Sequence, residues 1–210
     1  MTWSTVSLGA YANQESGGTN YVLYSNDISN TNSWQDGNAS VSSAATIAPD
    51  GTLTGNLLTR VSGNGNSRLQ IIRFTSDGTK TFSMYVKAGT AATCYFQPYD
   101  SNDAAPSPFV ACTFGSPPTV VQNGGTGTVS ILSTTTEANG WYRIGFAVGG
   151  FTAANTNALY CFPDLNTGNG STAYMWGIQA NDGGSILPYA ESTDTFAVIR
   201  TPRWHGITAP

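Results

Sequence analysis

Residues 81–87 read TFSMYVK, and this stretch decides the class of fold. It alternates large apolar side chains with polar or amphipathic ones: Phe82, Met84 and Val86 against Ser83, Tyr85 and Lys87. Successive side chains of an extended chain point to opposite faces, so this alternation places all three apolar residues on one face. The stretch therefore predicts a β-strand with one face in a core and the other toward solvent or a partner.

Similar short runs recur along the chain, separated by turn sequences such as PDG and SDG. Residues 141–148 (WYRIGFAV) alternate in the same way, and residues 91–98 (AATCYFQP) set Cys94 and Phe96 against Tyr95 and Gln97. Other predicted strands cover residues 21–24, 54–61, 68–74, 109–114, 128–132, 158–162 and 174–178. About ten short antiparallel strands with turns between them predict an all-β sandwich or jelly roll.

Composition narrows the class of protein further. Only 10% of the 210 residues are charged, against roughly 25% in a typical domain, which argues against a helical bundle or coiled coil. The net charge of −4 argues against nucleic acid as the main partner. No apolar run is long enough for a membrane span, and the first ten residues lack the pattern of a signal peptide. We therefore expect no nucleic-acid and no membrane partner.

The residues that usually carry catalysis or bind metals are sparse. The single histidine is His205, and the three cysteines favour small buried hydrophobes over a disulfide framework. The twelve acidic residues are scattered, mostly in turns, so the sequence predicts no enzyme and no catalytic residues. No cofactor is predicted either. Calcium is left open, with Asp50 and Asp182 as weak candidate ligands, although turn formation explains both residues more simply.

Five segments together resemble a jelly-roll module common in structural proteins of tailed phages. They match, in order, its NLLxYSxxFxxxxW opening, its APDGT turn, its FSVYVKAG strand, its NGWYR strand start and its YxWGAQxExG…PY ending. In this sequence they are residues 21–28 with Trp34, residues 48–52, residues 82–89, residues 139–143, and residues 174–179 with Gly184, Pro188 and Tyr189. The module is similar to xylanase-associated carbohydrate-binding jelly rolls and occurs in tail fibres, tail-associated proteins and capsid decoration proteins.

The resemblance covers the expected jelly-roll β-sandwich over residues 21–192. The polar, glycine-containing residues 1–20 indicate an N-terminal arm, and residues 193–210 a C-terminal tail. It implies a non-enzymatic virion protein, expected to be a capsid decoration (cement) protein or a short tail appendage, assembled in the host cytoplasm. Its partners would be the major capsid protein or tail proteins, and family analogy suggests a homotrimer. The arms would pack on their own domain or dock on neighbouring subunits. The arm residues expected to anchor the chain are Trp3, Leu8, Tyr11, Phe196, Ile199, Arg200, Arg203 and Trp204.

The alternative hypothesis is a glycan-binding module or tail fibre domain that attaches to host-surface carbohydrate. Sugar sites combine aromatic rings with polar side chains that fix the ligand. The outward positions of the predicted strands supply both kinds: Tyr85, Tyr95, Gln97, Tyr99, Trp141 and Arg143. Tyr85 and Trp141 could equally cover the other sheet or a subunit interface.

Overall fold

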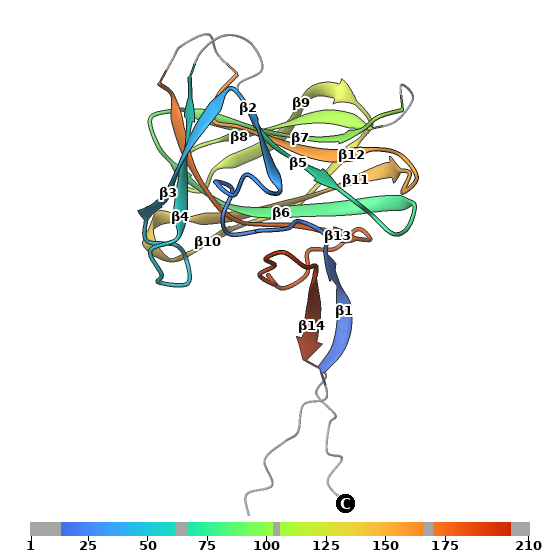
Figure 1. The fold of residues 1–210 in the computed structure, drawn as a ribbon. Coiled ribbons are helices and arrows are strands. Elements are labelled where there is room, and N and C mark those ends of the chain that lie inside the picture. Colours follow the sequence, from blue (N-terminus) through green and yellow to red (C-terminus); the bar gives the residue numbers. More distant parts are fainter. Residues whose placement is uncertain (1–13, 62–66, 103–105, 166–169, 203–210) are drawn as a thin grey trace, which may run out of the picture.

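The computed structural model describes residues 14–61, 67–102, 106–165 and 170–202, which fold as a jelly-roll β-sandwich (Figure 1). Two six-stranded antiparallel sheets pack face to face, and a two-stranded ribbon extends from them. Within this part of the chain, no helix is long and apolar enough to span a bilayer. The all-β class predicted from the alternation is confirmed. The arm residues Trp3, Leu8, Tyr11, Arg203 and Trp204 lie outside the described residues.

The strands of each sheet are named here in their spatial order. Sheet I consists of β10 (Val129–Thr136), β11 (Tyr142–Phe151), β6 (Gly78–Ala88), β13 (Thr172–Asp182), β4 (Gly55–Arg60) and β3 (Ala39–Thr46). Sheet II consists of β2 (Trp34–Gly37), β5 (Ser67–Ile72), β12 (Asn157–Phe162), β7 (Thr93–Asp100), β8 (Ser107–Thr113) and β9 (Thr119–Thr126). The ribbon pairs β1 (Gln14–Asn20) with β14 (Ala197–Pro202), and the 3-10 turn η1 (Ala138–Gly140) precedes β11.

The strand predicted over residues 21–24 is wrong. Tyr24 has a φ of 47°, in the left-handed region that interrupts a strand. The backbone here bonds to two different segments: the Tyr21 amide donates to Ala180 O (2.9 Å) and the Tyr24 amide to Thr193 O (2.9 Å). The sequence also failed to predict strands β1, β2, β3, β9 and β14. All five lie at a sheet edge or in the two-stranded ribbon, and the mostly exposed residues of β9 carry little apolar alternation.

The core lies between the sheets and follows the predicted alternation. Phe82, Met84 and Val86 of β6 have no exposed surface, and the Phe82 and Phe146 rings stack with centroids 5.8 Å apart. Sheet II contributes Cys94, Phe96 and other inward residues to the same cluster. All three cysteines are buried free thiols, and desolvation raises the pKa of Cys94 and Cys161. Their interpretation as buried hydrophobes is therefore confirmed.

The centre of the outer face of sheet I is covered by another segment of the same chain. The expectation that the outward side chains of residues 81–87 meet solvent or a partner is therefore wrong at this centre. Residues 185–190 cross this face, where Arg143 Nη2 donates to Leu187 O at 2.7 Å. The Gln179 amide group contacts the same segment, because its Oε1 accepts from the Ala190 amide at 3.0 Å. Gly145 lies directly beneath the crossing, where a Cβ would force the Ile186 side chain to shift. The alternating residue Ser83 is consequently fully buried.

The predicted arms pair with each other where the structure describes them. In the ribbon, Thr19 lies opposite Val198 and the Arg200 backbone lies opposite Ser16. Ile199 is buried, whereas Phe196 is 41% exposed and sets its ring edge against Tyr21, with centroids 5.5 Å apart. Docking of these segments on neighbouring subunits stays a prediction.

An ion pair fastens the end of β13 to the start of β6. The Lys80 side chain is completely buried and its Nζ donates to Asp182 Oδ1 and to Ser76 O (2.6 Å). The Tyr21 hydroxyl donates to the second Asp182 oxygen at 2.8 Å. Burial by itself raises the pKa of Asp182, but hydrogen bonds from Lys80, Tyr21 and Ser76 outweigh this effect and lower it. The carboxylate is therefore held in its charged form.

We predict that Asp182→Asn lowers the free energy of unfolding by about 1–2 kcal/mol, because it leaves the buried Lys80 ammonium without its counter-charge. The loss is smaller than for a fully buried pair, since the Asp182 side chain is 40% exposed and solvent screens it. Because the folded-state pKa is lowered, this contribution is complete at neutral pH and declines as the pH falls below about 4.

Urea unfolding at pH 7 and pH 3 measures both effects. Asp194→Asn is the matched control, since Asp194 is exposed and is bonded only to the neighbouring Thr193 hydroxyl (3.2 Å) among the described residues. Equal stability of the two variants at pH 7 would contradict the prediction.

Candidate functional site

Strand β7 presents three of the six predicted glycan-binding residues on the outer face of sheet II. Its residues alternate between buried and half-buried along the whole strand. Cys94 and Phe96 point into the core, while Tyr95, Gln97 and Tyr99 point outward and are half-buried. The alternation predicted for residues 91–98 is confirmed, and it puts these three side chains in one row.

Neighbouring strands add aromatic rings that the sequence did not single out. In the β12–β7 ladder, Tyr160 lies opposite Gln97 and Phe162 opposite Tyr95. We call Tyr99, Phe109, Tyr160 and Phe162 the aromatic face. Its ring centroids lie 6.1 Å apart for Tyr99 and Tyr160, 6.2 Å for Tyr160 and Phe162, and 5.8 Å for Phe109 and Phe162. These rings therefore form one contiguous cluster across three strands.

The aromatic face surrounds a hollow of about 480 Å³ whose rim also includes Ser67, Gln97 and Leu165. The Gln97 amide nitrogen donates to Ser107 Oγ at 2.9 Å, which fixes the side chain. Desolvation raises the pKa of Tyr160, with Tyr99 adding to the effect, and desolvation also raises the pKa of Tyr95. Both phenols are consequently protonated at neutral pH and can donate hydrogen bonds. The site offers apolar rings with a few polar groups beside them.

The other three predicted glycan-binding residues lie on sheet I, within the covered part of the molecule. Trp141 has no exposed surface and donates from Nε1 to Ile47 O at 2.8 Å. Its role as a sugar-stacking ring is therefore corrected: no face of the indole is open to a ligand. Arg143 lies over the Tyr85 ring, 5.4 Å from the centroid, and holds residue 187.

Tyr85 packs beside Trp176 and Tyr189 in a second small apolar cluster that includes Trp141. Ring centroids lie 5.2 Å apart for Tyr85 and Trp176, and 5.8 Å for Tyr85 and Tyr189. Burial raises the pKa of Tyr85, opposed by Arg143 and assisted by Glu137. This cluster packs residues 185–190 of the same chain against sheet I, a structural role that the sequence did not predict for these rings.

The two weak calcium candidates are engaged in other interactions. Asp50 Oδ1 accepts from the Thr52 amide (2.9 Å) and the Thr52 hydroxyl (2.7 Å), which is a local turn. Asp182 holds Lys80, whose positive charge opposes a cation beside it. In the described ranges, no three His, Cys, Asp or Glu side chains gather as a metal site. Calcium binding itself stays untested.

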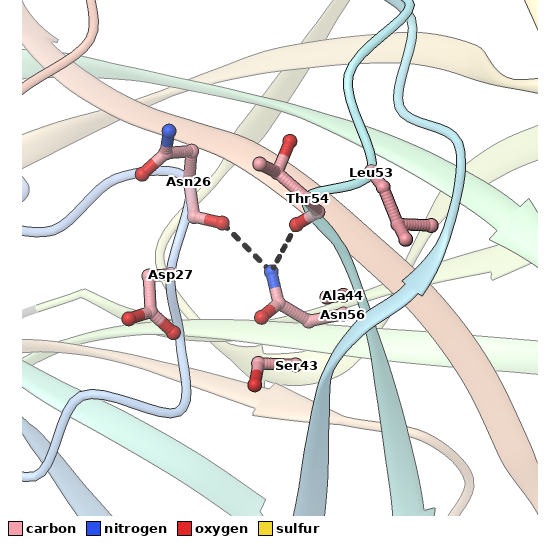
Figure 2. Close-up of a pocket in the computed structure, with 7 residues that line it drawn as sticks. All are labelled: Asn26, Asp27, Ser43, Ala44, Leu53, Thr54 and Asn56. Atoms are coloured by element: carbon pink, nitrogen blue, oxygen red, sulfur yellow. Dashed lines mark hydrogen bonds between the residues drawn. The ribbon is translucent and has the colours of Figure 1, made fainter.

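A second, smaller hollow of about 180 Å³ lies on sheet I and is lined by Asn26, Asp27, Ser43, Ala44, Leu53, Thr54 and Asn56 (Figure 2). The buried Asn56 amide nitrogen donates to Asn26 O (2.8 Å) and Thr54 O (3.3 Å). Asn56 Oδ1 has no partner among the described residues and points toward the hollow. A water molecule would satisfy it. With no aromatic lining, this hollow is the poorer sugar site.

No family model matches the sequence, and no curated protein matches it. A solved structure with a similar fold contains the CBM22-1 and GH10 modules of endo-1,4-β-D-xylanase 10B from Clostridium thermocellum, complexed with xylohexaose. Identity is 13% and the TM-score is 0.43; the match covers 85% of this chain and 30% of the xylanase chain. The chain thus spans less than a third of that protein's length.

We predict that Trp141→Phe destabilises the fold without removing ligand binding from the folded protein. The smaller ring leaves a cavity and an unpartnered Ile47 carbonyl, which together cost about 2–3 kcal/mol. Thermal and urea unfolding measure the loss. Unchanged stability would contradict the buried structural role of Trp141. Loss of glycan binding by a variant that is fully folded would show instead that Trp141 contacts the ligand.

Proposed function

We propose that this chain is a non-catalytic carbohydrate-binding domain whose ligand lies along the aromatic face of sheet II. The observation that carries the proposal is the contiguous cluster of Tyr99, Phe109, Tyr160 and Phe162 around one hollow. The proposal is based on these four aromatic side chains and the polar side chains beside them. A sugar ring has apolar C–H faces and polar edges, so it is matched by aromatic rings bordered by hydrogen-bonding groups.

The dimensions and chemistry of the hollow agree with such a ligand. Its volume of about 480 Å³ lies within the range of roughly 300–1,000 Å³ typical of small-molecule sites. The protonated phenol of Tyr160 supplies a hydrogen-bond donor to the hollow, and Gln97 is held in place by Ser107. Because the rings are built on strands and touch one another, they are already positioned before a ligand arrives.

We predict that Tyr160→Ala weakens glycan binding at least tenfold, because Tyr160 contacts rings on both sides and its loss breaks the cluster. A glycan array identifies the ligand, and titration calorimetry with that ligand measures the change. Tyr99→Phe removes one hydroxyl while keeping the ring, so it should reduce affinity by a few-fold only.

Tyr174→Ala is the matched control, a half-buried tyrosine on the outer side of sheet I. It should leave the affinity unchanged. A broad array without a single bound glycan would refute the proposed function, as would a Tyr160→Ala protein that is folded and binds as well as the wild type.

A second candidate function is assembly on a tailed-phage particle, as a decoration protein or short tail appendage. Its basis is the set of five phage-module motifs, and the ribbon of β1 and β14 supports it. The ribbon extends away from the sandwich (Figure 1) and suits a stem that anchors a compact domain. In this proposal the chain is a virion component, its partners are capsid or tail proteins, and the glycan belongs to the host surface.

Light scattering tests the homotrimer that this second candidate includes. We predict a solution mass three times that of the 22.0 kDa chain. Removing residues 193–210 should lower this mass to that of a single chain, since the tail expected to dock on neighbouring subunits would be lost. A full-length protein that is monomeric at tens of micromolar would overturn the trimer.

A further inference from the structure

Arg73, at one end of sheet II, has no acidic partner among the described residues. Arg73 directly follows β5 and is exposed. Among the described residues, its guanidinium takes part in no ion pair and no hydrogen bond. Two acidic groups of the neighbouring loops are engaged elsewhere: Asp77 Oδ1 accepts from the Ala153 amide (2.8 Å), and Asp100 Oδ2 from the Thr152 amide (2.9 Å).

Arg73 belongs to the same outward row as the aromatic face. Along β5, Leu69 is half-buried and Ile71 is exposed, while the residues between them are buried, so odd positions point outward. Ile71 lies opposite Ala158 of β12, and Ala158 lies opposite Tyr99 of β7. Two strand spacings and two residues along the strand separate the Tyr99 and Arg73 backbones, which is about 12 Å. A short oligosaccharide spans that distance.

The surroundings of Arg73 leave room for a ligand. It lines two hollows of about 310 Å³ each, one on either side. The first is bordered by Asn32, Ser33 and Gln35, and the second by Asn155 and Thr156, so polar side chains accompany the guanidinium. The hollow with Gln35 also includes the exposed Ile71, which joins it to the outer face of the sheet.

We propose that the glycan bound by this protein is acidic and that Arg73 pairs with its carboxylate. This inference rests on the proposed function, since it assigns the ligand class of the same face. A guanidinium presents two parallel N–H donors that match the two oxygens of a carboxylate. The protein carries a net charge of −4, which disfavours anions in general. The positive charge of Arg73 offsets this repulsion of anions at one end of sheet II. Arg73 therefore favours acidic over neutral sugars.

The test uses an array of uronate-containing oligosaccharides, each printed beside the same oligosaccharide with its carboxyl groups reduced to primary alcohols. The wild-type protein should bind the acidic member at least tenfold more tightly. Arg73→Gln should bind both members equally, at the level of the wild type on the reduced form. Lys87→Gln is the matched control, because it removes the same charge from sheet I; it should keep the preference.

Sulfated versions of the reduced oligosaccharides separate a carboxylate site from a general anion site. Weaker binding of the sulfated than of the uronate member supports the assignment, and equal or tighter binding overturns it. Equal binding of acidic and reduced members by the wild type also overturns it, while leaving the proposed function intact. Absence of binding to every oligosaccharide refutes the proposed function itself.

Discussion

The structure depends on the burial of β6 and β13 on both of their faces. Their inner side chains fill the core, and the outer side chains of Ser83 and Gln179 at their centre lie beneath residues 185–190. A strand covered on both sides is among the most stable parts of a sheet, because its backbone hydrogen bonds are shielded from water. The two sheets therefore differ in their outer faces. The centre of sheet I is covered by another segment of the chain, whereas sheet II has an exposed aromatic surface.

The sequence predicted the sandwich because alternation is a local property that needs no knowledge of partners. It placed Phe82, Met84 and Val86 in the core and Tyr95 and Gln97 outside it, and the structure agrees. Alternation separates the two faces of a strand, but it does not reveal what covers the outward one. For that reason Tyr95 and Trp141 look alike in the sequence, although Tyr95 is half-buried on the outer face of its sheet and Trp141 is completely buried.

Long-range pairing explains the residues that sequence reasoning missed. Tyr160 and Phe162 join the aromatic face only because β12 lies beside β7, and their sequence contains no sign of that neighbour. Lys80 and Asp182 are likewise 102 positions apart, and neither position signals the other. The strand over residues 21–24 failed for a different reason: Tyr21 and Val22 are buried, but the backbone bonds of this segment are shared between two other segments.

The ribbon of β1 and β14 has a mechanical consequence. Because the two strands are antiparallel, Gln14 and Pro202 lie together at the ribbon's far end. A force that pulls these two residues apart loads one pair of hydrogen bonds at a time, as in opening a zipper. The ribbon would therefore yield gradually at low force, and the sandwich behind it would feel little tension until the last pair had opened.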